Sequence, residues 1–155
     1  MSVSQIREND KISHLHLPFP PYVEENDSLE QAIQIMQKKR VGCIPICQDL
    51  KIVGVFTERD YLLRILNKNV DIHDSVMNWM TKKVITANPD DSIRHVIETM
   101  ATHDIRHIPL VDQEKNLVGL VSVRNIVDFL VQYNPDEVYN LPPNLEQIHK
   151  TTDGG

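Results

Sequence analysis

Two four-residue segments of the chain each combine a hydroxyl, a guanidinium and a carboxyl or amide group. They read Thr57-Glu58-Arg59-Asp60 and Ser122-Val123-Arg124-Asn125. Each follows an apolar run and opens a helical pattern, so each is predicted to lie where a strand ends and a helix begins. Helix N-termini expose unpaired N–H groups and a partial positive charge, which together favour anions. The same pattern also fits an ordinary helix cap, and both interpretations stay open.

The two segments differ in their acceptor group. A carboxylate such as Asp60 can accept two hydrogen bonds from the hydroxyls of a diol, whereas the amide of Asn125 has one acceptor oxygen and no charge. A charge-assisted hydrogen bond is worth about 1.5–3 kcal/mol and a neutral one about 1 kcal/mol, so Asn125 is expected to hold a diol up to about tenfold more weakly. The basic side chains, in contrast, favour the second copy. Arg106-His107 precede an apolar run where the matching residues are Gly42-Cys43.

These matching positions belong to an internal repeat. Asp27-Ser28-Leu29 recurs as Asp91-Ser92-Ile93, and Ile44-Pro45-Ile46 recurs as Ile108-Pro109-Leu110, both 64 positions later. One residue added in the following turn changes the offset to 65 for the rest of the copy. An offset held over this length indicates two copies of one structural unit.

Each copy predicts the element order β-α-β-β-α. Apolar residues at i, i+3, i+4 and i+7 mark an amphipathic first helix in both copies, and a serine precedes each helix as its N-cap. Two apolar runs, about Cys43–Cys47 and Ile52–Phe56 in the first copy, are predicted to be buried strands. The second helices are predicted at Glu58–Asn67 and Val123–Tyr133.

A short strand is predicted before each first helix. Val84-Ile85-Thr86 is the clear case, whereas its counterpart near Tyr22-Val23 is poorer because three prolines precede it. Between the copies, Asp74–Met80 is predicted to form a short helix. A half of roughly 60 residues buries its helix faces poorly alone. The two halves are therefore expected to pack face to face with pseudo-two-fold symmetry, which leaves clefts between them.

Two stretches of the chain resemble the CBS (cystathionine-beta-synthase) domain family. They read VITANPDDSIRHVIETMATHDIRHIPLVDQEKNLVGLVSVRNIVDFLV and, in the first copy, VGCIPICQDLKIVGVFTERDYLLRIL. The resemblance implies an α/β (α+β) fold with a first CBS repeat at 12–68, a linker at 69–83, a second repeat at 84–133 and an extended C-terminal tail at 134–155. The chain is similar to stand-alone bacterial CBS-pair proteins, or Bateman modules, with no catalytic domain attached.

The resemblance also implies a ligand. Family members bind adenosine-type ligands between the repeats, so AMP, ADP or ATP is expected, with S-adenosylmethionine less favoured. They usually regulate another protein, which the sequence does not name, and many form flat dimers, so a homodimer is expected. The implied function is a non-catalytic energy or metabolite sensor. The alternative is a ligand-free dimerisation or protein-interaction module, which the apolar second helices support.

The family's residue roles carry over to matching positions. Asp60 is implied to bind a ribose diol, Thr57 the ribose or phosphate, and Arg59 the phosphate; these three form the second-choice cleft. The second copy has the better phosphate contacts, and phosphate charge dominates the affinity of a nucleotide, so its cleft is favoured. The favoured cleft comprises Thr86, Ala87, Arg106, His107, Ser122, Arg124 and Asn125. The alternatives are a solvated charge for Arg106, a structural histidine for His107, and plain strand-to-loop structure for Thr86 and Ala87.

Composition excludes several other functions. The chain has 155 residues and a formal net charge of −6, without a long run of lysine or arginine. This charge weighs against nucleic acid and against an anionic membrane. No apolar stretch approaches the roughly 20 residues that cross a bilayer, and residues 1–11 lack the apolar core of a signal peptide, so a cytoplasmic location is expected.

Metal and enzyme chemistry are not indicated. Cys43 and Cys47 are expected to be buried thiols, because a redox pair needs a closer spacing. His14 and His16 lack further ligands at zinc-like spacing, so no metal site is expected. The sequence has no G-x-S-x-G motif and no phosphate-binding loop, and no catalytic activity is expected.

Overall fold

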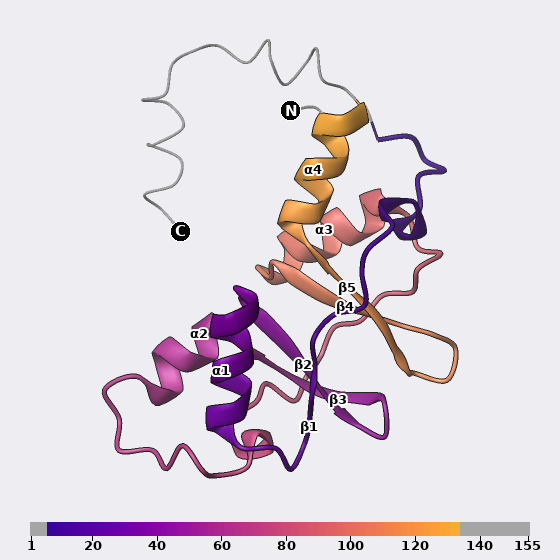
Figure 1. Ribbon diagram of the computed structural model, residues 1–155. Coiled ribbons are helices and arrows are strands. Elements are labelled where there is room, and N and C mark those ends of the chain that lie inside the picture. Colours follow the sequence, from indigo (N-terminus) through magenta and orange to yellow (C-terminus); the bar gives the residue numbers. More distant parts are fainter. Residues whose placement is uncertain (1–5, 134–155) are drawn as a thin grey trace, which may run out of the picture.

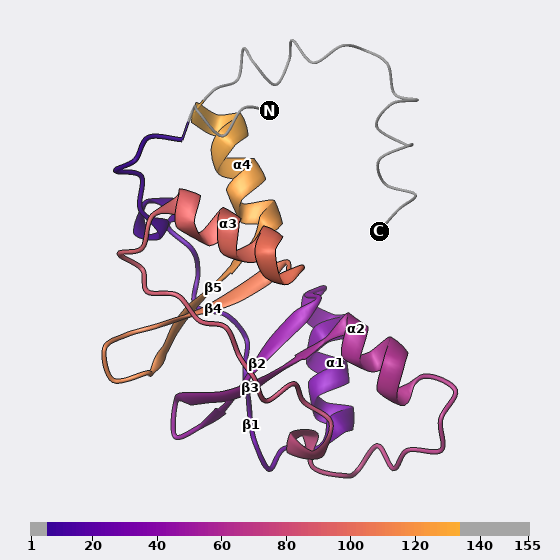
Figure 2. The ribbon, with the colours of Figure 1, turned by 180° about the vertical axis from the view of Figure 1, so that it is seen from behind.

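A computed structural model describes residues 6–133 of the chain (Figure 1). Within this range the chain forms two units, one above the other, each with a β-hairpin beside its own helices (Figures 1 and 2). The tail predicted at 134–155 lies outside the described residues. The predicted mixed α/β class with two packed repeats is confirmed.

The first repeat contains a three-stranded sheet in the order β1-β2-β3, with β1 parallel and β3 antiparallel to β2. Its second helix starts as an α-helical turn and continues as a π-helix, in which Leu66 N donates to Tyr61 O. The elements are β1 (Val23–Glu24), α1 (Leu29–Lys39), β2 (Cys43–Gln48), β3 (Lys51–Thr57), α2 (Glu58–Asp60) and the π-helix Tyr61–Ile65.

The second repeat contains the antiparallel hairpin β4-β5 and two full helices. The helix predicted at Val123–Tyr133 forms with those bounds. Ser28 and Ser92 cap the first helices of the two repeats, as predicted, since each hydroxyl accepts a backbone N–H three residues on. The elements are α3 (Ile93–His103), β4 (His107–Val111), β5 (Leu117–Ser122) and α4 (Val123–Tyr133).

The prediction for the strand before each first helix is wrong about which of the two copies has the clearer strand. The poorer candidate forms β1, whereas Val84–Thr86 forms no strand and Ala87 alone makes a parallel bridge to Leu110. Proline explains why pairing in the second repeat is limited to Ala87. In the first repeat Glu25 N donates to a carbonyl of β2 at 3.0 Å, but the matching residue is Pro89, which has no N–H. Strand pairing therefore stops after one residue in the second repeat.

An asparagine takes over the lost strand bond. Asn88 Nδ2 donates to Val111 O at 3.3 Å, and Val111 matches Cys47, the residue whose carbonyl accepts from Glu25. A side chain thus satisfies the carbonyl that the proline leaves open, as buried polar groups require.

The segment that precedes each repeat packs into the core of the other repeat, so the two leading segments are exchanged. Ile12, in a 3-10 turn (Ile12–Leu15), lies in the core of the second repeat, whereas Val76, in the matching turn of the linker (Val76–Asn78), lies in the core of the first. Figure 1 shows the N-terminal segment beginning beside α4 and running down to β1. The linker turn lies inside the range Asp74–Met80 predicted for a short helix and comprises Val76–Asn78.

Matched backbone hydrogen bonds fix this exchange. Ile12 N donates to Asp91 O at 3.0 Å, and Val76 N donates to Asp27 O at 2.8 Å. The donors Ile12 and Val76 are 64 positions apart, and so are the acceptors Asp27 and Asp91. The same contact is therefore present once in each repeat. This is direct evidence for the predicted pseudo-two-fold symmetry.

One glycine allows the linker to approach the first sheet. A Cβ atom at Gly54 would overlap the sulfur of Met80 and lie 3.0 Å from Thr81 O. Val55 and Thr81 also exchange two backbone hydrogen bonds, at 3.0 and 2.8 Å. Gly54 therefore lets the linker lie directly on β3.

Candidate functional site

The turn at the start of α2 is a closed hydrogen-bonded unit. Asp60 is 6% exposed, and its Oδ2 accepts from Thr57 N at 3.0 Å and from Thr57 Oγ1 at 3.1 Å. Asp60 N in turn donates to Thr57 Oγ1 at 3.2 Å. These are the contacts of a helix cap, which is the second interpretation that the sequence left open.

The other carboxylate oxygen of Asp60 contacts the linker and its own helix. Thr81 Oγ1 donates to Oδ1 at 2.9 Å, and Arg64 Nε lies 3.8 Å from the same oxygen. Arg64 extends further and donates through Nη1 to Trp79 O at 3.0 Å and Met80 O at 3.1 Å. The guanidinium therefore connects the helix start to the linker.

The turn at the start of α4 has the same form with a neutral side chain. Asn125 Oδ1 accepts from Ser122 N and Ser122 Oγ, both at 2.8 Å, and Asn125 N donates to Ser122 Oγ at 3.2 Å. The acceptor oxygen is thus engaged twice by the turn. The amide nitrogen takes no part in these bonds, so Asn125 offers a ligand a donor more readily than an acceptor.

The predicted basic pair lies next to both turns. His107 pairs with Ser122 across β4 and β5, and Arg106 O accepts from Val123 N at 3.0 Å. On the other side, Arg59 lies 3.7 Å from the Asp104 carboxylate and donates to Asp104 O at 3.5 Å. The structure therefore brings the first-repeat turn close to the second-repeat segment that precedes β4.

The surroundings of His107 favour its neutral form. Burial lowers the pKa of His107, and the neighbouring Arg106 cation lowers it as well, although the Glu58 carboxylate opposes them. Arg106 is exposed. At neutral pH Arg106 thus supplies the positive charge of the pair, while His107 supplies a hydrogen-bonding imidazole.

The remaining predicted positions are less distinctive. Ala87 is buried, and its backbone is used in sheet pairing, because its N–H donates to Pro109 O and its carbonyl accepts from Val111 N. Thr86 and Arg124 are exposed.

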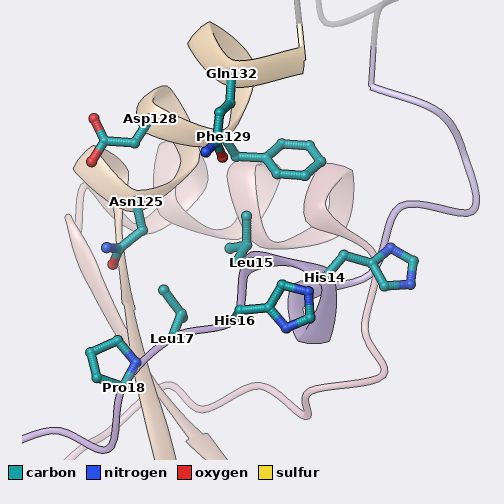
Figure 3. A pocket seen from close by; sticks show the side chains of 9 residues that line it. All are labelled: His14, Leu15, His16, Leu17, Pro18, Asn125, Asp128, Phe129 and Gln132. Atoms are coloured by element: carbon teal, nitrogen blue, oxygen red, sulfur yellow. The ribbon is translucent and has the colours of Figure 1, made fainter.

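A cavity of about 370 Å³ lies between the N-terminal segment and α4. Figure 3 shows Leu15 and Leu17 facing α4 across this space, with the ring of Phe129 above them. Among the predicted site residues, Asn125 alone lines it, and no local sequence pattern indicates the cavity. The lining residues are His14, Leu15, His16, Leu17, Pro18, Asn125, Asp128, Phe129 and Gln132.

Both cysteines are free and buried, as predicted. Burial raises the pKa of Cys43 to about 12 and that of Cys47 to about 11, so both thiols stay protonated and unreactive. Within residues 6–133, no three His, Cys, Asp or Glu side chains are grouped so as to hold a metal ion. No helix in that range is long and apolar enough to cross a membrane.

A protein-family model described as CBS domain matches the chain twice, at residues 9–67 and 74–132. The CBS domain-containing protein YhcV of Bacillus subtilis is 33% identical over 104 residues, which are 67% of this chain and 74% of that protein. Several other curated relatives are longer. The chain spans 22% of two proteins named homoserine O-acetyltransferase, so most of each of those proteins lies outside the match.

Solved structures show the same fold. The CBS domain pair of protein MJ0100 has a TM-score of 0.66 and 29% identity to this chain, covering 77% of this chain and 98% of that one. That structure is a complex with 5'-methylthioadenosine and S-adenosyl-L-methionine. The CBS-domain containing protein ATU1752 of Agrobacterium tumefaciens has a TM-score of 0.69 at 22% identity, covering 77% of this chain and 98% of that one.

Proposed function

Because this chain belongs to the CBS-domain family, with two copies in tandem, we propose that it is a non-catalytic regulatory module that binds AMP, ADP or ATP between its repeats. The observation that carries the proposal is the similar CBS pair of MJ0100, which holds two adenosine derivatives. The same proposal makes the chain a cytoplasmic homodimer that regulates another protein. An acetyltransferase activity is not proposed, since the chain spans 22% of the relatives with that name.

The basic pair favours a ligand with phosphate groups. Arg106 offers an exposed guanidinium, which binds phosphate through two parallel hydrogen bonds. His107 is neutral in the free protein, and a bound phosphate would raise its pKa again by supplying a nearby negative charge. The pair therefore favours a nucleotide over an uncharged adenosine derivative.

The two helix-start turns are the proposed ribose contacts. Ser122, Arg124 and Asn125 belong to the favoured cleft, with Thr86 and Ala87 beside the base. Thr57, Arg59 and Asp60 belong to the second cleft. A diol that binds Asp60 must displace the Thr81 hydroxyl from Asp60 Oδ1 or share that carboxylate oxygen with it. At Asn125, the amide nitrogen is the group that the turn leaves for a ligand.

A second candidate function rests on exposed apolar side chains. Leu62 is 59% and Leu63 is 64% exposed in the π-helix, and Val123 and Val127 of α4 are 41% and 39% exposed. Large exposed apolar side chains that form a patch favour association with another protein surface. A ligand-free dimerisation module would use these side chains and ignore nucleotides.

Calorimetry on protein stripped of nucleotide tests the proposal. We expect heat of binding with AMP, ADP or ATP, and a higher melting temperature, because a ligand that binds the native state stabilises it by about 2.7 kcal/mol at 100 times Kd. No heat at millimolar concentration of any of the three, with a stable dimer, would favour the second function.

A substitution sharpens this test. Arg106→Ala should weaken AMP binding more than adenosine binding, because adenosine has no phosphate. Lys38→Ala, which removes an exposed cation from α1, is the matched control and should change neither. Equal losses for AMP and adenosine would show that Arg106 does not contact the phosphate.

A further inference from the structure

The carboxylate that would bind a ribose in the second cleft is already occupied by hydrogen bonds of the chain itself. A carboxylate has about four acceptor positions, two on each oxygen. Both positions on Asp60 Oδ2 are taken, by the backbone N–H and the hydroxyl of Thr57 at 3.0 and 3.1 Å. Asp60 Oδ1 accepts from the Thr81 hydroxyl at 2.9 Å and faces Arg64 Nε at 3.8 Å. At most one position is therefore left for a ribose diol, which needs two.

The linker that carries Thr81 is held in place from two sides. The guanidinium of Arg64 donates through Nη1 to Trp79 O at 3.0 Å and to Met80 O at 3.1 Å. Thr81 follows these residues directly, and its backbone exchanges two hydrogen bonds with Val55 of β3, at 3.0 and 2.8 Å. The Thr81 hydroxyl is thus kept against the carboxylate, and a diol would have to displace it from a fixed position.

The favoured cleft has neither of these groups. Leu17 stands where the linker has Thr81, at the offset of 64, and Phe129 stands in place of Arg64, at the offset of 65. Among the residues that the structure describes, the side chain of Asn125 bonds only within its own turn. Leu17, Asn125 and Phe129 all line the cavity of about 370 Å³ (Figure 3). The favoured cleft therefore opens onto free volume, whereas hydrogen bonds cross the second cleft.

We propose that Thr81 and Arg64 close the second cleft to nucleotides, so that each chain binds one nucleotide, in the favoured cleft. This inference rests on the proposed function and adds which of the two clefts is used and which residues decide it. Thr81 competes with the ribose hydroxyls for Asp60. Arg64 balances the charge of the carboxylate and holds the linker that carries the competing hydroxyl. Both residues act by occupying the group that a nucleotide would need.

Calorimetry with AMP, ADP and ATP counts the nucleotides bound by each chain. The unaltered full chain should bind one. The double variant with Arg64→Ala and Thr81→Val should bind two, because acceptor positions on Asp60 become free. A chain with one of the two substitutions should bind its second nucleotide about tenfold more weakly than the double variant, since one competing contact to a charged group remains. Lys68→Ala removes an exposed cation just after the π-helix and, as the matched control, should leave the count at one.

Two further measurements separate closure by the hydroxyl from a change of shape. Thr81→Ser keeps the hydroxyl and should keep the count at one, whereas Thr81→Val has the shape of threonine without the hydroxyl. An NMR titration locates the bound nucleotide. The amide signals of residues 122–125 should shift in the unaltered chain, and those of residues 57–60 should shift strongly in the double variant alone.

Each outcome has its own meaning. Two nucleotides on the unaltered chain, or shifts at both turns in it, would overturn the closure and leave the proposed function standing. Weaker binding in the Arg64→Ala chain would make Arg64 a ligand contact and would also overturn it, as would a folded double variant that still binds one nucleotide. No heat with any nucleotide in any variant would overturn the proposed function, and the closure with it. If the double variant does not fold, the unaltered chain and Thr81→Val decide.

Discussion

The two repeats share one fold but differ in the space between the second helix and the leading segment that packs on it. This space is filled by side chains in the first repeat and is a cavity in the second. In the first repeat, Arg64 and Thr81 fill that space with hydrogen bonds to the linker and to Asp60. In the second repeat, the matching residues are Phe129 and Leu17, and a cavity remains. Duplicated units can therefore come to differ in a few side chains and in part of their backbone contacts.

The turns at the helix starts diverge in the same direction. Both are closed by reciprocal bonds between a hydroxyl and the third residue of the helix. The first turn contains a buried carboxylate that binds a cation of its own chain, and the second contains a neutral amide. The carboxylate of the first turn is thus bonded within the chain, whereas the amide nitrogen of Asn125 takes no part in the bonds of the second turn.

The largest effect is expected where the linker lies on the first sheet. Gly54→Ala should destabilise the protein by about 1–3 kcal/mol, because the added methyl group overlaps Met80 and approaches the Thr81 carbonyl. Urea unfolding measures this. Gly119→Ala is the matched control in the second repeat, where the neighbour is the end of the Leu110 side chain at 3.0 Å. Equal losses would mean that the linker contact is not special to the first repeat.

The next effect concerns the guanidinium that fills the first repeat. Arg64→Ala should cost about 1–2 kcal/mol, because two backbone carbonyls lose their donor and the buried Asp60 loses its ion pair. Arg59→Ala is the control, since its partner Asp104 is exposed and such pairs contribute at most about 1 kcal/mol. Thermal unfolding compares the two. A larger loss for Arg59 would remove the contrast drawn between the repeats.

Converting one turn into the other should change ligand affinity. Asn125→Asp gives the second repeat the carboxylate of the first, and should tighten AMP binding by up to about tenfold if the ribose diol lies there. Calorimetry measures the change. Ser122→Ala with Asn125→Asp controls for loss of the turn itself. Unchanged affinity would place the ribose at Asp60 instead.

The smallest effect is a pH dependence. His107 stands where the first repeat has Cys43, and burial lowers the pKa of His107 below its ordinary 6.5. The unfolded chain therefore binds the proton more readily, so this contribution to stability is complete above about pH 6.5 and is lost as the pH falls through the lowered pKa. His107→Cys should flatten this part of the stability curve in urea unfolding. An unchanged curve would assign the pH dependence to other groups.

The local elements could be predicted because their signals are local. The serine caps, the helix periodicity and the repeat offset are all read within one segment, and α4 forms as predicted. The strand predicted at Val84–Thr86 does not form; pairing begins further on, at Ala87, and ends there because Pro89 removes the next pairing bond, which propensity does not show. The offset itself could have revealed Pro89, since it matches Glu25.

The cavity could not be predicted, because it depends on contacts between segments far apart in the chain. The pairing of Phe129 with residues 14–18 follows from the exchange of leading segments, which no local pattern indicates. The replacement of Arg64 by Phe129 is visible in the aligned repeats. Its meaning becomes clear only once Arg64 is seen to reach Trp79 and Met80.

The exchanged leading segments make the two repeats mutually dependent for folding. Ile12 completes the apolar interior of the second repeat and Val76 that of the first, so cutting the chain between the repeats would strip each half of part of its interior. Neither half is then expected to fold on its own, and the chain should melt in a single cooperative step. Deletion of either repeat together with its leading segment would therefore also remove part of the interior of the other.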